Sequence, residues 1–134
     1  MTPDPATCQV TSPLREVARL MLENDCGLVP VIDEQGRAVG TVTDRDIALR
    51  VVAEGRDPAQ CTAQDCMTSP VASVNIESSL TEATELMESE QIRRVLVIDQ
   101  DGRLCGVIAQ ADVALSGRDR KTAELVKHVS EPKH

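Results

Sequence analysis

The apolar positions in the first half of the chain follow a helical period and then an extended one. Between residues 14 and 21 apolar side chains recur at the spacing i, i+3, i+4 and i+7, which predicts a helix with one buried face. The uninterrupted apolar run Leu28–Ile32 is typical of a strand that is buried on both faces. The predicted elements are, in chain order, a strand over Thr7–Val10, a helix that Ser12-Pro13 caps and Asn24-Asp25 ends, hairpin strands over Leu28–Ile32 and Ala38–Val42, and a helix from Thr43 to about Glu54.

The same order of patterns returns in the second half. Thr62–Cys66, between the halves, is expected to form one helical turn that leads into Met67-Thr68. The predicted elements that follow are a strand over Ser73–Ile76, a helix over Leu80–Glu90, hairpin strands over Arg94–Ile98 and Leu104–Ala109, a helix from about Ala111, and an amphipathic segment over Lys121–Val129.

A shift of 66 residues superimposes the two halves without a gap. It places Met1-Thr2 on Met67-Thr68 and Val31–Asp33 on Val97–Asp99. We therefore predict an α/β (α+β) fold made of two pseudo-symmetric β-α-β-β-α repeats, each of which buries its apolar face against the other. The expected division is a first repeat over 1–58, a linker over 59–66, a second repeat over 67–130 and a frayed tail over 131–134.

Composition narrows the possible functions. The net charge of -8 argues against a nucleic-acid partner, since such proteins neutralise phosphates with basic residues. No apolar run approaches the roughly 18 residues that span a membrane, and the first residues do not resemble a signal peptide, so we expect cytoplasmic residence. The chain has no Phe, Tyr or Trp, so a planar ligand must lie between aliphatic side chains and backbone.

The five cysteines have no CxxC spacing. An odd number with this spacing predicts neither a disulfide framework nor a zinc site, and we expect no metal. Buried thiols that act as small hydrophobic side chains are the simplest interpretation. A thiol redox sensor remains an alternative, because a sequence does not show which thiols lie close together.

The candidate site is the segment Gly40–Asp46, where a predicted strand leads into a helix. Thr43 with Asp46 three residues later has an ordinary explanation as a reciprocal helix cap. Three features favour a binding site instead: the helix begins where a buried strand ends, Gly40 lets a ligand approach the backbone, and Asp44 and Arg45 add more charge than a cap needs.

The chemistry of these residues suits a nucleotide. A helix N-terminus favours phosphate, and a Thr hydroxyl can donate to phosphate or ribose oxygens. A carboxylate such as that of Asp46 can accept hydrogen bonds from both ribose hydroxyls. An adenine ring would lie between aliphatic side chains such as Val29 and the first strand.

The two repeats, the Met-Thr pair near each start and the motif GTVTDRD resemble a tandem pair of cystathionine-β-synthase (CBS) domains, a Bateman module, over essentially the whole chain. The resemblance is to small stand-alone prokaryotic proteins of this family. It implies a regulatory module that binds AMP, ADP, ATP or S-adenosylmethionine as a ligand, with no cofactor and no catalysis. It also implies that Gly40, Thr43 and Asp46 contact ribose and phosphate, and that Pro30 lines the pocket.

The second copy of the motif departs from the first. Asp112 matches Asp46, but Ala109 stands where the first copy has Thr43. Arg93 and Arg94 precede the second buried strand, where many family members carry a basic residue near the phosphates; an exposed basic pair is the alternative. We expect two unequal sites, with the first the stronger.

Other classes of function stay open beside nucleotide sensing. A ligand-free oligomerisation or interaction module is the main alternative. An enzyme is not expected, because the only histidines, His128 and His134, lie near the tail and no nucleophile–base set is apparent. We expect a homodimer that pairs through helical faces and a regulated protein partner; the stripes considered for pairing are Leu14, Val17, Ala18 and Met21, and Leu80, Ala83 and Met87.

Overall fold

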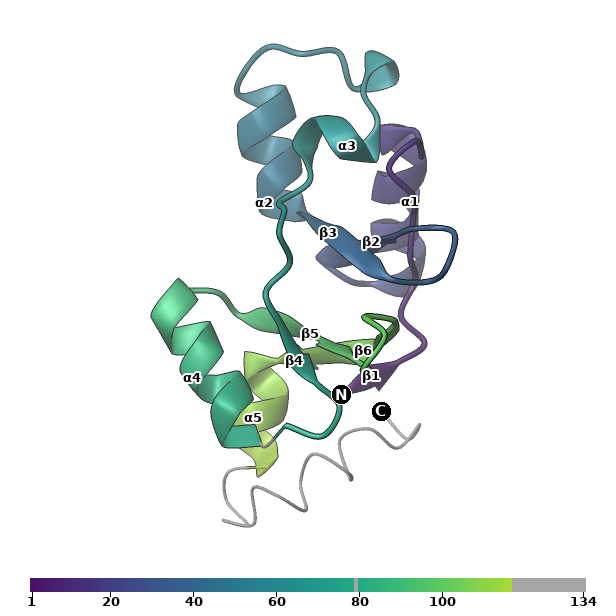
Figure 1. The fold of residues 1–134 in the computed structure, drawn as a ribbon. Coiled ribbons are helices and arrows are strands. Elements are labelled where there is room, and N and C mark those ends of the chain that lie inside the picture. The colour runs from purple at the N-terminus through teal and green to yellow at the C-terminus, as the bar shows by residue number, and fades with distance from the viewer. Residues whose placement is uncertain (79, 117–134) are drawn as a thin grey trace. The chain divides into compact units, whose positions relative to one another are not determined.

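The computed structural model describes residues 1–78 and 80–116 and has a mixed α/β fold (Figure 1). The predicted segment Lys121–Val129 and the tail 131–134 lie outside the described residues. The strands are β1 (Thr2–Pro3), β2 (Leu28–Ile32), β3 (Ala38–Thr43), β4 (Ser73–Asn75), β5 (Arg94–Ile98) and β6 (Leu104–Ala109). The α-helices are α1 (Leu14–Asn24), α2 (Asp44–Ile47), α3 (Ala63–Cys66), α4 (Leu80–Glu90) and α5 (Gln110–Ser116).

The chain forms two compact units, which are described separately. The first-repeat unit is Ala6–Val71, and the second-repeat unit is Met1–Pro5 together with the chain from Ala72. Within the second-repeat unit, β1 pairs with β6, with Thr2 opposite Val107. The first residues of each repeat therefore belong to the unit formed by the other repeat: residues 1–5 lie in the second-repeat unit, and residues 67–71 lie in the first-repeat unit. The sequence pattern did not reveal this exchange.

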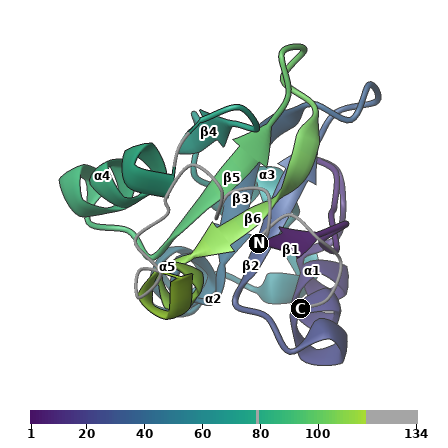
Figure 2. The same ribbon diagram turned by 90° about the horizontal axis from the view of Figure 1, so that it is seen from below.

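Both units contain an antiparallel hairpin, β2–β3 in one and β5–β6 in the other, and the two hairpins have the same strand register. In the second-repeat unit the sheet order is β1-β6-β5-β4, with β5 between β4 and β6 (Figure 2). In the first-repeat unit, β2 and β3 form the antiparallel hairpin, Thr68 forms a bridge with Thr41, and Cys8 forms a parallel bridge with Val31. The strand predicted over Thr7–Val10 is thus a single bridge, because the chain turns directly afterwards, where the Ser12 amide donates to the Gln9 carbonyl at 3.0 Å.

Helix α1 ends where predicted, at Asn24, but begins one residue later than predicted and has a narrower buried face. Pro13 occupies the cap position without a side-chain cap, since the Ser12 hydroxyl oxygen accepts from the Gln9 amide at 2.9 Å. Leu14 and Val17 are buried, whereas Ala18 is exposed. The prediction of Ser12 as N-cap was therefore wrong, and the apolar face is narrower than the spacing indicated.

Each unit has its own apolar core. The first-repeat core includes Leu14, Val17, Val29, Val31 and Val42. In the second-repeat unit helices α4 and α5 pack together (Figure 1). They border a cavity of about 270 Å³, which is lined by Thr84, Met87, Glu88, Ile92, Gln110 and Val113. Among the described residues, none of the helices has the length and apolar character required to cross a bilayer.

The helix after β3 changes its type within two turns. α2 continues as a π-helical segment, Ala48–Val52, whose widened turn is closed by a hydrogen bond from the Ala53 amide to the Ala48 carbonyl at 2.8 Å. A 3-10 turn, Pro58–Gln60, follows, and α3 then forms the helical turn expected before Met67-Thr68. π-helical turns inside helices occur frequently at functional sites.

Candidate functional site

The start of α2 is organised by a reciprocal cap between two predicted site residues. The Thr43 amide donates to Asp46 Oδ2 at 2.9 Å, and the Asp46 amide donates to Thr43 Oγ1 at 3.0 Å. The reciprocal helix cap that could explain this residue pair without a ligand is therefore present. It does not exhaust their chemistry, because Thr43 Oγ1 accepts in the cap and its proton remains able to donate.

The other oxygen of the Asp46 carboxylate faces a second cluster of side chains. Thr68 Oγ1 donates to Asp46 Oδ1 at 3.3 Å, and Arg50 Nε lies 4.0 Å from the same oxygen. Arg50 Nη1 also donates to the backbone carbonyls of Cys66 at 3.1 Å and Met67 at 2.9 Å. Only 12% of the Asp46 side chain is exposed, against 49% of Arg50, so the carboxylate is mostly covered while the guanidinium borders solvent.

Gly40 has a packing role in the first-repeat unit. A Cβ at this position would lie 2.7 Å from Met67 Sδ and 3.1 Å from the Thr68 carbonyl oxygen. The neighbouring Thr41 exchanges two backbone hydrogen bonds with Thr68, at 3.0 and 2.8 Å. The space beside Gly40, where we expected a ligand to approach, therefore holds the chain's own Met67.

The remaining predicted residues of the first site divide into exposed and buried ones. Asp44 and Arg45 are exposed in the first turn of α2, where Asp44 Oδ1 accepts from the Arg45 amide at 2.8 Å. Val29 and Pro30 are buried, Val29 within the apolar core of its unit. The structure thus gathers Thr43, Asp44, Arg45 and Asp46 at one helix start and places Val29 in the core.

The second copy of the motif keeps half of this arrangement. The Ala109 amide donates to Asp112 Oδ2 at 2.9 Å, but Ala109 has no hydroxyl to return the bond. The Met1 ammonium lies 3.8 Å from Asp112 Oδ2; burial lowers the pKa of this amine, and Asp112 partly opposes the shift. A Cβ on Gly106 would lie 2.6 Å from Met1 Sδ, which repeats the packing of Gly40 against Met67.

Arg93 and Arg94 lie at the same end of the second hairpin as this helix start. Arg94 pairs with Ala109, and the Arg93 carbonyl accepts from the Gln110 amide at 2.7 Å. Arg93 is exposed and Arg94 is half-buried. The two arginines and Asp112 therefore belong to one region of the second-repeat unit.

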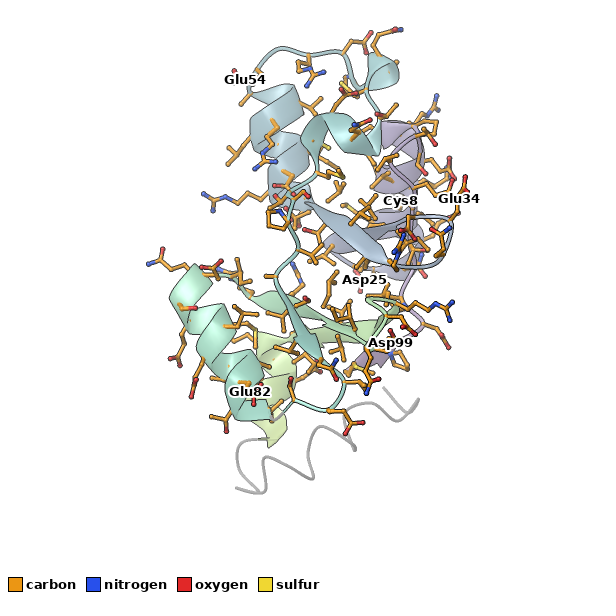
Figure 3. The ribbon with its side chains drawn as sticks, in the orientation of Figure 1. Cys8, Asp25, Glu34, Glu54, Glu82 and Asp99 are labelled. Atoms are coloured by element: carbon orange, nitrogen blue, oxygen red, sulfur yellow. The ribbon has the colours of Figure 1, made fainter. Side chains whose placement is uncertain are left out.

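Three of the five thiols lie together in the apolar core of the first-repeat unit: Cys8, Cys61 and Cys66 are between 1% and 6% exposed (Cys8 is labelled in Figure 3). Burial raises the pKa of Cys8 and of Cys66 to about 11, so both remain neutral thiols at physiological pH. Because the thiolate is the reactive form, this environment argues against a redox sensor built on them. In the described part of the chain, no cluster of three or more His, Cys, Asp or Glu side chains is arranged to hold a metal ion.

Sequence reasoning singled out Thr43 and Asp46 but missed Arg50 and Thr68. Arg50 stands four residues after Asp46, the spacing at which helical side chains meet, so this signal was available. Thr68 could be found only through its pairing with Thr41, which joins residues distant in sequence.

Comparison with known proteins agrees with this architecture. The chain is 39% identical to the CBS domain-containing protein YhcV of Bacillus subtilis, over 92% of this chain and 86% of that protein. Hypoxic response protein 1 of Mycobacterium tuberculosis is 34% identical over 89% of this chain and 82% of its own length.

A solved structure gives the same picture. The CBS domain protein PAE2072 from Pyrobaculum aerophilum, complexed with AMP, superimposes with a TM-score of 0.75 at 32% identity, over 84% of this chain and 85% of that chain. The family model of the CBS domain matches this sequence twice, at residues 1–53 and 63–116. The chain therefore belongs to the CBS domain family, as a tandem pair of CBS domains.

Proposed function

We propose that this chain is a regulatory module that binds an adenine nucleotide at the Thr43–Asp46 helix start and does not turn it over. The observation that carries the proposal is the Thr43–Asp46 pair, already fixed by its reciprocal cap, in a chain 32% identical to a protein that was crystallised with AMP. Thr43 would donate its hydroxyl to a phosphate or ribose oxygen. Asp46 would accept from the ribose hydroxyls.

The chemistry of the helix start supports binding without catalysis. Its side chains are a hydroxyl, carboxylates and guanidinium groups, which can position a nucleotide and include no histidine. Asp44 and Asp46 are two residues apart on one helix, a spacing at which side chains do not face each other. These two carboxylates are therefore not placed to hold a metal ion that could activate water for hydrolysis. We therefore propose reversible, saturable binding, with Asp112, Arg93 and Arg94 forming a second and weaker nucleotide site.

A ligand screen by dye-based thermal unfolding tests this proposal; an extrinsic dye is needed because the chain has no Trp. AMP, ADP, ATP and S-adenosylmethionine would be compared with CMP as a control. At a concentration 100 times the Kd, the preferred ligand is expected to stabilise the folded state by about 2.7 kcal/mol. Chromatography after incubation should recover it intact.

An unchanged melting temperature with every adenine ligand would refute nucleotide sensing and favour the ligand-free interaction module. Steady release of ADP or AMP from ATP would refute the regulatory assignment. The matched variant Thr43→Ala should weaken binding, because it removes the hydroxyl that Ala109 also lacks in the second copy. Its helix retains the Asp46 side chain as acceptor for the amide of residue 43.

We also propose that two copies of the chain associate, through side chains other than those expected. Leu14 and Val17 are buried in the first-repeat core, and Leu80, Ala83 and Met87 in the second, so these five residues pack within the chain, whereas Ala18 is exposed. Large apolar side chains are instead exposed at Leu22, Leu49 and Val52, to 79%, 52% and 64%. Leu49 and Val52 both lie in the π-helical segment after α2.

Light scattering at micromolar concentration is expected to give about twice the chain mass of 14.5 kDa. A charge at position 49 would have to be buried without a partner in such an interface, so Leu49→Glu should yield the monomer mass. Gln35→Glu is a suitable control, since it adds one negative charge at an exposed position in the turn between β2 and β3. A wild-type protein of monomer mass would contradict this proposal.

A further inference from the structure

We propose that Thr68 competes with the ligand for Asp46, and that Arg50 is the positioning residue that links Asp46 to the segment Cys66–Thr68. The inference rests on the proposed nucleotide site and adds a mode of regulation to it. It follows from contacts within the first-repeat unit, where a hydroxyl and a guanidinium both face the carboxylate oxygen that the cap leaves available.

The two oxygens of Asp46 are held with different strength. Oδ2 accepts from the Thr43 backbone amide at 2.9 Å, a good hydrogen-bond distance. Oδ1 accepts from Thr68 Oγ1 at 3.3 Å, beyond the usual range of about 2.5–3.0 Å for two oxygens, and its nearest guanidinium nitrogen is 4.0 Å away. Oδ1 is therefore the oxygen that a ribose hydroxyl can take at the lower cost.

A ribose hydroxyl that donates to Oδ1 must share this oxygen with Thr68 and Arg50 or displace one of them. A carboxylate oxygen has about two lone-pair positions, and here one accepts from Thr68 while Arg50 lies beside the atom. The Thr68 hydroxyl is the group more easily displaced, since its hydrogen bond to Oδ1 is long and the residue is exposed. Ligand binding therefore releases Thr68 from Asp46.

The displaced residue belongs to a short connecting segment. Arg50 fixes the beginning of this segment through the carbonyls of Cys66 and Met67, and Thr68 forms the bridge with Thr41. After Thr68 the chain runs to Val71, the last residue of the first-repeat unit. Occupancy of Asp46 is thus coupled to the residues where the chain leaves this unit.

The second repeat does not have the residue needed for this link. The 66-residue shift places Ser116 at the position of Arg50, so the helix that follows β6 carries no arginine four residues after Asp112. The coupling is therefore a property of the first site alone, and Asp112 provides an internal comparison.

Calorimetry with AMP tests the competition. Thr68→Val keeps the shape of the side chain but removes the competing hydroxyl, so AMP affinity at the first site is expected to rise by about two- to tenfold, the equivalent of one hydrogen bond. Thr68→Ser retains the hydroxyl and should bind AMP as the wild type does. Asp112→Ala, introduced with each variant, removes the contribution of the second site.

Hydrogen exchange at the Thr68 amide supplies a second measurement. This amide donates to the Thr41 carbonyl at 2.8 Å, and saturating AMP is expected to speed its exchange in the wild type. In Arg50→Gln the exchange should be faster without AMP and should change less on binding. A merely structural role of Arg50 would change the basal rate and leave the response to AMP intact.

The outcomes separate the two proposals. If the wild type binds AMP but Thr68→Val binds it equally or more weakly, the competition is refuted and the nucleotide site stands. If the wild type does not bind AMP, the nucleotide site fails and this inference fails with it. Higher affinity in Thr68→Val, with wild-type affinity in Thr68→Ser, supports both.

Discussion

The free energy of unfolding is expected to fall steeply between pH 9 and pH 11, because two thiols are buried as neutral groups in the first-repeat core. Burial is the main cause that raises the pKa of the Cys8 and Cys66 thiols from 9.0 to about 11. Negative neighbours add to the shift. The charged and titratable groups involved are Glu16 and Cys66 for Cys8, and Asp46, Cys61 and Asp65 for Cys66, with Arg50 acting in the opposite direction.

The sign follows from proton binding in the two states. In the unfolded chain these thiols lose their protons near pH 9.0, whereas in the folded protein they keep them up to about pH 11. Between these values the unfolded state binds fewer protons, so a rise in pH favours unfolding. The contribution of the two protonated thiols to the free energy of unfolding is complete below pH 9 and is lost as the pH rises through 11. Each thiol contributes roughly 1 kcal/mol per pH unit, so the pair accounts for a few kcal/mol.

Urea unfolding at pH 8, 9, 10 and 11, followed by circular dichroism, measures this loss. The double variant Cys8→Ala/Cys66→Ala is the matched control, and it should lose less stability over the same range, although cavities lower its stability at every pH. Equal slopes for the two proteins would show that thiol burial is not the cause. A thiol-specific reagent at pH 8 should react slowly with Cys8 and Cys66 in the folded wild type.

The elements of each repeat could be predicted from local pattern because their causes are local. The run Leu28–Ile32 and the returning strand occupy the predicted positions, and α4 has its predicted bounds, Leu80–Glu90. Helix α5 begins at Gln110, one residue before the expected start. Apolar periodicity and turn residues determine these features, and both depend on residues that are close together in the sequence.

The parts that could not be predicted depend on contacts between residues distant in sequence. β1 has only two residues, too few to show an apolar periodicity, so its pairing with β6 could not be predicted from the sequence pattern. The exposure of Ala18 is likewise decided by tertiary packing, since its spacing alone matches the buried face. At the site, the sequence indicates Thr43 and Asp46, but the position of Thr68 follows from strand pairing.

These observations also explain why a capping motif and a ligand site can occupy the same residues. The cap uses Asp46 Oδ2 and the acceptor side of Thr43 Oγ1, which leaves Asp46 Oδ1 and the Thr43 proton for other partners. The cap therefore orients the groups that a nucleotide would contact. A fixed orientation lowers the entropic cost of binding, so the structural and functional explanations support each other.

Replacement of Asp46 by Ala is expected to have the largest effect on ligand binding of any single change in the first-repeat unit. It removes the proposed acceptor of the ribose hydroxyls, a loss of about 1.5–3 kcal/mol when the lost partner is charged. The affinity for the preferred adenine nucleotide should fall by roughly ten- to a hundredfold. The same change removes the acceptor for the Thr43 amide and the partner of Arg50, so stability should fall by about 1–2 kcal/mol.

Two further variants separate the loss of binding from the loss of structure. Asp46→Asn retains an oxygen that can accept from the Thr43 amide but has no negative charge, so it should preserve most of the stability and still bind nucleotide weakly. Asp112→Ala removes the corresponding carboxylate in the second-repeat unit, where it accepts from the Ala109 amide, and should cost less affinity because that site has no threonine. Calorimetry on the three variants, each checked by urea unfolding, measures both quantities. Unchanged affinity in Asp46→Ala, in a protein that remains folded, would show that Asp46 only caps its helix.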